Sequence, residues 1–375
     1  MIVFIRSYLI RTDSRLHRYF RVLEAAGLPW TAIAWDRTGV EPEDPRCTWY
    51  RQVSPVGGGW RNFGRILAWN VFAFRTLWQR RREVSVVHAV DLDGALGAAL
   101  FAMLARRPLI FDAFDKYSDT RNLTGWPARV CDALERWCMR RARTVLLPDP
   151  ARETQHGIAG WPSIRVIENV PADTPSAISA RREGPARRPD GRLRLVYVGT
   201  LEPRHRGLED LLATVAERPD RVELWVAGTG PLAALFADQA ARLANLSFFG
   251  EVSPDRALEL MGDGDIVVGL YYLTSRNHRY AAPNKYYEHL MLGRPLLTTI
   301  ETPPGQRVEE GGTGWAIPEG RSAIAAWIDS LSFDEAAARG ERAARHWEAE
   351  YADYVARTLT PLYLACVASP SAIAL

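Results

Sequence analysis

The segment Ala282–Thr299 holds the residues whose types and spacing best suit chemistry. Lys285 and Glu288 are three positions apart, so on a helix they would share one face. Pro283 suits the start of that helix, and Gly293 suits its end. A cation and a carboxylate near a helix N-terminus could hold a phosphate and a sugar diol. The structural alternative is an i,i+3 ion pair worth roughly 0.2–0.5 kcal/mol.

Two further segments place glycine at the end of a predicted strand. In Val196–Gly207 the strand is followed by Arg204, Arg206 and a predicted helix. Glycine lets the backbone turn sharply towards a ligand, and the free N–H groups of a helix N-terminus suit phosphate. In Val226–Pro231 two glycines follow the strand, but the third glycine of a dinucleotide-binding loop is missing. A tight turn lining the cleft is therefore the better interpretation of Val226–Pro231. For Val196–Gly207 the alternative is an ordinary strand-to-helix turn with solvated arginines.

Polar side chains also follow two predicted strands in the first half of the chain. His88 lies in Val86–Asp91, and Asp112 and Asp115 lie in Leu109–Asp115. The carboxyl ends of parallel strands meet at the sheet edge where ligands bind. One aspartate could act as a general base towards a hydroxyl, and Asp115 is favoured because it lies further out. The alternatives are a structural histidine and turn-stabilising aspartates.

These segments belong to a chain in which short apolar runs alternate with amphipathic stretches, which predicts parallel sheets buried on both faces. The predicted strands are Ile2–Ile5, Thr31–Trp35, Val84–His88, Leu109–Phe111, Thr144–Leu147, Arg165–Ile167, Leu193–Val198, Val222–Ala227, Leu246–Phe249, Asp265–Val268 and Pro295–Thr299. The predicted helices are Ser14–Ala26, Arg61–Arg82, Leu92–Ala105, Ala128–Arg141, Leu208–Ala216, Pro231–Ala244, Pro254–Met261, Asn284–Leu292, Ser322–Leu331 and Asp334–Ala356.

Residues 171–192 interrupt this alternation with prolines and glycines among arginines, and they are the predicted linker. We therefore expect one α/β domain over residues 1–170 and another over 193–345, followed by a helix within 346–375. Two such halves would leave a cleft between them, a usual place for a ligand.

The segment Ala282–Thr299 resembles the nucleotide-sugar signature PxKxxExxxxGxPV of GT-B glycosyltransferases, particularly those like glycosyltransferase family 4. Gly199–Gly207 and Gly228–Pro231 resemble the same family. The resemblance covers about residues 190–320 closely and 1–170 loosely. It implies the GT-B fold: two Rossmann-like parallel-sheet domains facing a central cleft, with the acceptor on the first, the donor on the second and the final helix returning to the first.

The resemblance also implies roles for individual residues. Glu288 would bind the donor ribose hydroxyls, Lys285 and Arg206 would face the diphosphate, and Val252 would lie near the base. The implied donor-binding residues are Gly199, Thr200, Arg204, Arg206, Gly228, Gly230, Val252, Asn284, Lys285 and Glu288. The implied catalytic candidates are Asp115, Asp112 and His88.

Three positions depart from the family pattern. Tyr280 stands where the family often has a first glutamate that binds the transferred sugar. Thr200 stands at the position of a phosphate-binding arginine, for which Arg204 is the substitute. Val90 replaces the second histidine of the family's strand-end segment. The sugar and the choice between inversion and retention therefore stay open.

The resemblance implies a hexosyltransferase-type enzyme that moves a sugar from a nucleoside-diphosphate sugar to a hydroxyl acceptor. No metal or other cofactor is expected. The acceptor class is a saccharide or a lipid-linked saccharide, as in surface polysaccharide or glycoconjugate synthesis. Two alternatives remain: a sugar-nucleotide 2-epimerase of GT-B fold, and a catalytically silent GT-B subunit that binds nucleotide or a partner.

The charge distribution and the aromatic content favour a membrane surface rather than nucleic acid as a binding partner. Residues 1–170 carry an excess of Lys and Arg, and residues 193–375 an excess of Asp and Glu. Trp60–Arg82 combines tryptophans, phenylalanines and a terminal run of arginines, a composition that suits an anionic membrane surface or a core helix. With four cysteines and no long apolar run, we expect a cytoplasmic protein, peripheral at the inner face of the membrane, that binds no nucleic acid.

Overall fold

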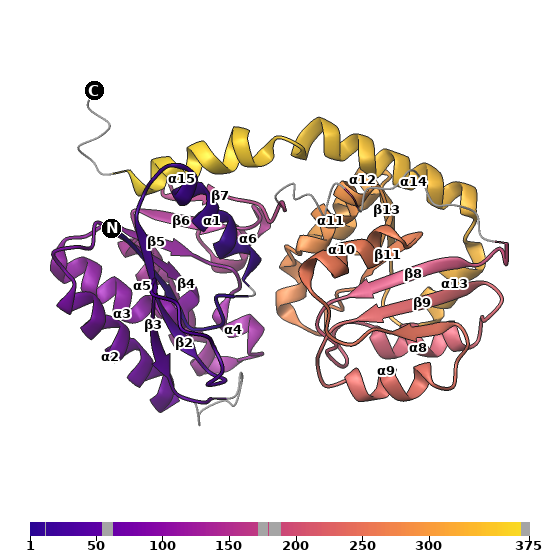
Figure 1. Ribbon diagram of the computed structural model, residues 1–375, viewed down its shortest axis with the longest axis horizontal. Coiled ribbons are helices and arrows are strands. Elements are labelled where there is room, and N and C mark those ends of the chain that lie inside the picture. The colour runs from indigo at the N-terminus through magenta and orange to yellow at the C-terminus, as the bar shows by residue number, and fades with distance from the viewer. Residues whose placement is uncertain (12, 55–62, 172–178, 180–188, 369–375) are drawn as a thin grey trace. The chain divides into compact units, whose positions relative to one another are not determined.

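The computed structural model describes residues 1–11, 13–54, 63–171, 179 and 189–368. The chain forms two compact units, Met1–Glu168 with Val355–Leu375, and Asn169–Tyr354 (Figure 1). Most of the predicted linker and residues 60–62 lie outside the described residues. The second unit extends to Tyr354, beyond the expected boundary at residue 345, because the segment after that residue still packs on it: the Tyr351 ring lies 5.2 Å from the Tyr287 ring.

The first unit is built on a seven-stranded sheet in which every described pairing is parallel. Its strands, in the spatial order β3-β2-β1-β4-β5-β6-β7, are β1 (Ile2–Arg6), β2 (Trp30–Asp36), β3 (Cys47–Arg51), β4 (Val86–Val90), β5 (Leu109–Asp112), β6 (Thr144–Leu147) and β7 (Ile164–Val166). The strand β3 was not predicted, because this half-buried edge strand has no run of Val, Ile or Leu.

Helices cover both faces of this sheet (Figure 1). The helices of the unit are α1 (Ser14–Ala25), α2 (Phe63–Gln79), α3 (Asp91–Ala105), α4 (Tyr117–Thr120), α5 (Gly125–Arg141), α6 (Ala151–His156) and α15 (Thr360–Val367). On one face α2, α3 and α5 share a core with the strands, in which Trp35 and Trp69 stack with ring centroids 5.9 Å apart. On the other face Phe20 of α1 meets Phe4 at 4.9 Å.

A series of buried polar contacts connects α15 to the first sheet. The Tyr363 hydroxyl lies 2.8 Å from His88 Nδ1, and His88 Nε2 lies 3.4 Å from Asp112. Arg15 of α1 completes this series with an ion pair of 3.0 Å to Asp112. Burial lowers the pKa of His88. Burial alone would raise the pKa of Asp112, but the Arg15 and His88 contacts outweigh it and hold that pKa at about 2.

The second unit repeats the plan with a six-stranded sheet, again with every described pairing parallel. In the spatial order β10-β9-β8-β11-β12-β13, its strands are β8 (Leu193–Val198), β9 (Val222–Ala227), β10 (Leu246–Phe248), β11 (Ile266–Gly269), β12 (Leu296–Thr299) and β13 (Gly314–Ile317). The two Rossmann-like parallel-sheet domains expected from the sequence are confirmed. The short β13 was missed because two of its four residues are only half-buried and it opens on glycine.

The helices of the second unit are α8 (Leu208–Ala216), α9 (Ala233–Ala240), α10 (Pro254–Gly262), α11 (Asn284–Leu292), α12 (Pro303–Gly311), α13 (Arg321–Ser330) and α14 (Phe333–His346), with the short 3-10 helix η2 at Arg276–Tyr280. One helix was predicted over Asp334–Ala356. Instead α14 ends at His346, and the π-helical segments η3 (Trp347–Tyr351) and η4 (Val355–Leu359) follow it. Among the described helices none is long and apolar enough to cross a membrane.

The Tyr363 contact predicts a measurable loss of stability. Tyr363→Phe removes the hydroxyl from His88 in a fully buried environment. We expect the free energy of unfolding in urea to fall by about 1–3 kcal/mol, the cost of an unsatisfied buried polar group. Tyr50→Phe is the matched control, because the Tyr50 hydroxyl donates to the exposed side chain of Gln52. A Tyr363→Phe protein as stable as the Tyr50→Phe protein would contradict this role.

Candidate functional site

Lys285 joins three elements of the second unit at the carboxyl edge of its sheet. It lies in the first turn of α11, which begins after extended Pro283 and ends at Gly293. The side chain is buried, and its ammonium donates to the Val198 carbonyl at the end of β8. A Cβ at Gly269, the last residue of β11, would lie 2.9 Å from Lys285 Cδ. Glycine there makes room for the lysine.

The charge of Lys285 depends on its neighbours. Burial lowers the pKa of Lys285 to about 8, although Glu288 raises it and Arg206 lowers it further. The Arg206 guanidinium lies 3.6 Å from Glu202 and 5.1 Å from the ring centroid of Tyr271. The structure therefore brings the predicted residues Lys285, Glu288 and Arg206 into one electrostatic cluster.

The glycine loops after β8 and β9 pack directly on each other. A Cβ at Gly228 would lie 1.8 Å from the Gly199 carbonyl oxygen, and one at Gly230 would lie 2.6 Å from the Leu201 oxygen. Both glycines also have positive φ, +138° and +146°. The Leu201 N–H donates to the Thr229 carbonyl at 2.8 Å. Only glycine fits this contact, so the backbone itself forms the surface beyond these two strands.

The remaining predicted donor residues surround these loops. The Gly228 N–H donates to the Gly250 carbonyl at 2.7 Å, which places the turn before half-buried Val252 beside the glycine loops. Thr200 is exposed, and Asn284 is half-buried at the start of α11. Arg204 is exposed, with φ +69° and its backbone N–H held by Glu209 at 3.1 Å. The donor set thus comes from the ends of β8, β9 and β10 and from α11.

The three predicted catalytic residues of the first unit differ in how deeply they are buried. His88 and Asp112 are completely buried, and they form polar contacts with Tyr363, with Arg15 and with each other. A substrate cannot reach these two side chains without rearranging the core, so this burial favours structural roles for both. Asp115, in contrast, has 46% of its side chain exposed and forms an ion pair of 2.9 Å with Arg152.

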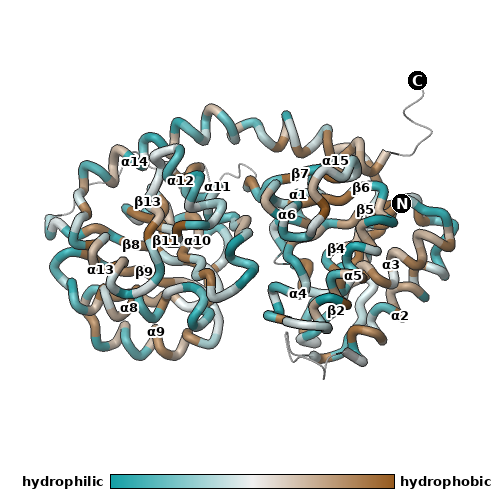
Figure 2. The backbone as a smooth tube through the Cα atoms, turned by 180° about the vertical axis from the view of Figure 1, so that it is seen from behind, coloured by the Kyte–Doolittle hydropathy of each residue, from teal (hydrophilic) through white to brown (hydrophobic). Residues whose placement is uncertain are grey.

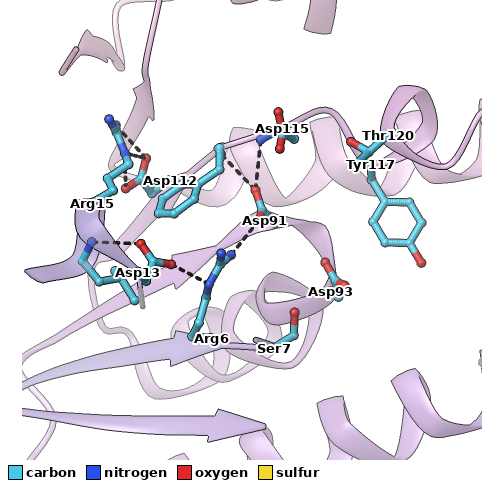
Figure 3. Close-up of polar contacts among 12 residues, drawn as sticks. Arg6, Ser7, Asp13, Arg15, Asp91, Asp93, Asp112, Asp115, Tyr117 and Thr120 are labelled. Atoms are coloured by element: carbon cyan, nitrogen blue, oxygen red, sulfur yellow. Dashed lines mark hydrogen bonds and ion pairs between the residues drawn. The ribbon is translucent and has the colours of Figure 1, made fainter. Parts of the chain in front are cut away.

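Asp115 borders a pocket at the carboxyl edge of the first sheet (Figure 3). The charged residues that line this pocket, of about 180 Å³, are Arg6, Arg37, Asp91, Asp93, Asp115 and Arg121. Ser7, Tyr8, Tyr117 and Thr120 complete its wall. Such a mixture of guanidinium, carboxylate, hydroxyl and aromatic groups can bind a polar organic molecule in a fixed orientation.

Asp91 is one of the pocket residues that were not predicted as site residues from the sequence. It directly follows β4, and its φ of +54° is unusual for a residue other than glycine. One carboxylate oxygen accepts from the Phe114 and Asp115 N–H groups at 2.9 and 3.3 Å, and the other lies 2.8 Å from Arg6. Burial raises the pKa of Asp91 to about 7, Asp93 adds to the rise, and Arg6 opposes it. Its position after a strand was the signal available in the sequence.

The described residues contain no group of three or more His, Cys, Asp or Glu side chains that could hold a metal ion.

Comparison with known proteins gives matches to both units. The family model described as "Glycosyl transferase 4-like domain" matches residues 13–170. The model described as "Glycosyl transferases group 1" matches residues 192–334. A search of curated protein sequences finds no match.

Solved structures of similar fold cover nearly the whole chain. HepE from Anabaena, in complex with UDP and glucose, is 18% identical, covers 96% of this chain and 99% of its own, and gives a TM-score of 0.67. Sucrose-phosphate synthase from Thermosynechococcus elongatus is 14% identical, with 97% and 98% covered and a TM-score of 0.72. WaaG, a glycosyltransferase involved in lipopolysaccharide biosynthesis, is 14% identical, with 97% and 99% covered and a TM-score of 0.65.

These matches confirm the resemblance drawn from the strand-end glycines and from α11. The two parallel-sheet units are those of the GT-B fold. The two family models together account for most of both units. The chain therefore belongs to the GT-B glycosyltransferases that these two models describe.

Proposed function

We propose that the protein transfers a hexosyl group from a nucleoside-diphosphate sugar to a hydroxyl acceptor, with the donor held by the second unit. The observation that carries this proposal is the cluster of Lys285, Arg206 and Glu288 beside the glycine loops. HepE, which shares the fold, has been solved with UDP and with UDP-glucose, which supports a uridine nucleotide as the first donor to test.

The cluster can serve both ends of such a donor. When the bond between the sugar and the β-phosphate breaks, negative charge develops on the leaving diphosphate. Lys285 and Arg206 supply positive charge there, and the N-terminus of α11 supplies N–H groups. No metal ion is needed in this scheme. Glu288 lies one turn along α11 from Lys285, where its carboxylate can accept hydrogen bonds from the two ribose hydroxyls.

Glu288→Gln should weaken nucleotide binding without unfolding the protein, because Glu288 is only half-buried. Hydrogen bonds to a charged group are worth about 1.5–3 kcal/mol each, so we expect at least a tenfold loss of UDP affinity in calorimetry. Glu259→Gln is the matched control, since Glu259 is an exposed carboxylate of the same unit that pairs with Arg256. Equal UDP affinity in the two variants would remove Glu288 from the donor site.

Nucleotide affinity should also depend on the charge of Lys285. Because the pKa of Lys285 lies at about 8, its ammonium loses a proton as the pH rises through that value. We expect UDP affinity to decline between about pH 7 and pH 9. Lys285→Met should bind UDP more weakly at neutral pH and show a flatter dependence, with thermal melting as the check on folding. A decline of the same size in Lys285→Met would assign the effect to another group.

We further propose that the acceptor is a lipid-linked saccharide presented at the cytoplasmic face of an anionic membrane. The supporting feature is an apolar face on α2 and α3, which Figure 2 shows as brown segments beside hydrophilic ones. Its exposed residues are Leu67, Val71, Trp78, Leu100, Met103 and Leu104. The arginines of the same helices and their ends are Arg65, Arg75, Arg80, Arg81, Arg82, Arg106 and Arg107.

The sequences of residues 63–82 and 94–107 contain these arginines but no aspartate or glutamate. Anionic lipid contributes about 1 kcal/mol for each Lys or Arg near the surface, and exposed apolar side chains add to that attraction. This combination supports reversible docking to a membrane. It equally fits synthesis of surface polysaccharide or glycoconjugate, in which lipid-linked acceptors are used.

Co-sedimentation with vesicles tests this second proposal. We expect the protein to sediment with anionic vesicles at low salt and to be released at high salt, because exposed charges are screened beyond about 10 Å at 0.1 M. Trp78→Glu with Leu104→Glu should abolish sedimentation. Leu235→Glu, at an exposed apolar residue of the second unit, should not. No sedimentation of the unmodified protein at low salt would overturn the membrane proposal.

A further inference from the structure

We propose that the pocket of the first unit holds a neutral saccharide acceptor and that Asp91 receives the hydrogen bond of its reacting hydroxyl. This inference rests on the proposed sugar transfer, because it assigns the acceptor half of that reaction. It differs from the expectation drawn from the sequence, in which Asp115 was favoured.

The location of the pocket follows from the parallel sheet. Arg6 ends β1, Asp91 follows β4, and Asp115 follows β5, and these three strands are neighbours. Figure 3 shows Asp91 between Arg6 and the backbone that leads to Asp115. Ligands of parallel α/β sheets bind at this edge. The pocket lies entirely within the first unit, as a site for the second substrate requires.

The positive and negative side chains that line the pocket pair with each other, and this balance favours a neutral ligand. Arg6 lies 2.8 Å from Asp91. Arg121 and Arg37 lie 2.9 and 3.7 Å from the same carboxylate, Asp93. A phosphate or carboxylate ligand would have to compete with these carboxylates for the guanidinium groups. A sugar offers hydroxyls that both donate and accept, so it can bind the pairs without separating them.

Aromatic groups at the pocket wall suit the same ligand. Tyr8 is 41% exposed, and Tyr117 is half-buried with the Arg121 guanidinium 3.6 Å from its ring centroid. Tyrosine offers an apolar ring and a hydroxyl, which match the C–H face and the hydroxyl edge of a sugar. The volume of about 180 Å³ is suited to one sugar ring rather than to an oligosaccharide.

Asp91 is held more firmly than Asp115. Its positive φ persists because two backbone N–H groups and Arg6 fix the carboxylate. Only 18% of the side chain is exposed, and it borders the pocket. Asp115 has 46% of its side chain in solvent and is drawn aside by Arg152. A reacting hydroxyl needs a fixed partner, because a displacement of about 1 Å can cost a hundredfold in rate.

The ionised carboxylate of Asp91 accepts a hydrogen bond, whereas the protonated form has one oxygen occupied by its own proton. The charged groups that face it are Arg6 from β1, with Asp13 behind it, Asp93 from α3, and Asp115 after β5. Since the pKa of Asp91 lies at about 7, the ionised fraction increases as the pH rises through 7. Use of an acceptor should increase over the same range.

The test measures UDP release from a UDP-sugar with and without added acceptor, using p-nitrophenyl glycosides and the corresponding sugar 6-phosphates as probes. We expect the neutral glycosides to be preferred and kcat/KM for the glycoside to rise through pH 7. Asp91→Asn should lower that kcat/KM at least tenfold and flatten its pH dependence, while UDP affinity stays unchanged. Asp115→Asn is the matched control. It should keep a rise of kcat/KM with pH, moved to lower pH, because it removes a carboxylate that raises the pKa of Asp91.

A second variant keeps the test decisive if Asp91→Asn folds poorly. Thr120→Trp, at an exposed residue of the pocket wall, should fill the pocket and abolish binding of the glycoside in ligand-observed NMR. Unchanged glycoside binding in Thr120→Trp, a preference for phosphorylated sugars, or an unchanged pH profile in Asp91→Asn would overturn the inference. Failure of the unmodified protein to bind any nucleotide would instead refute the proposed function.

Discussion

Every described strand pairing in both sheets is parallel, and this constraint decides where chemistry can occur. Parallel strands bring all their carboxyl ends to one edge, and each return helix starts there with free N–H groups. Lys285 and the glycine loops lie at that edge in the second unit, and Asp91 lies there in the first. Polar groups that lie beyond this edge, such as Asp91, border a pocket and are available to a ligand, whereas Asp112, within β5, is buried.

The two aspartates that follow β4 and end β5 show how environment separates similar residues. Asp112 is fully buried but faces Arg15 and His88, and these partners keep its pKa at about 2. Asp91 also faces an arginine, yet its two neighbouring carboxylates and its burial raise its pKa to about 7. The first arrangement favours a permanent charge that holds the core together. The second favours a group that changes protonation in the physiological range.

The sequence predicted most of the fold because buried parallel strands are continuous apolar runs. Leu193–Val198, Val222–Ala227 and Thr144–Leu147 were predicted with the bounds that the structure gives them. Edge strands were harder: β3 has exposed polar residues, and β13 is short. The helices α4 and α6 were missed because they have only one turn or two in which to show periodicity, and α12 was missed because its opening residues, Pro303–Gly305, are typical of a turn.

The candidate donor site was more predictable than the acceptor pocket. Its residues come from contiguous motifs, so the spacing of Lys285 and Glu288 and the glycines after β8 and β9 can be read along the chain. The pocket of the first unit is assembled from Arg6, Arg37, Asp91 and Arg121, which are far apart in sequence. Burial distinguishes Asp91 from Asp112. The burial of a strand end depends on helices from distant parts of the chain, as α15 shows by placing Tyr363 against His88.

The positions of the arginines in the structure change the interpretation of the basic first half of the chain. The positive balance along the sequence was interpreted as favouring an anionic membrane surface. In the structure the pocket arginines Arg6, Arg37 and Arg121 each contact a carboxylate. Further arginines lie within residues 63–82 and 94–107, which contain no aspartate or glutamate. The arginines of α2 and α3 therefore support attraction to an anionic membrane surface. The paired arginines of the pocket support a neutral saccharide there.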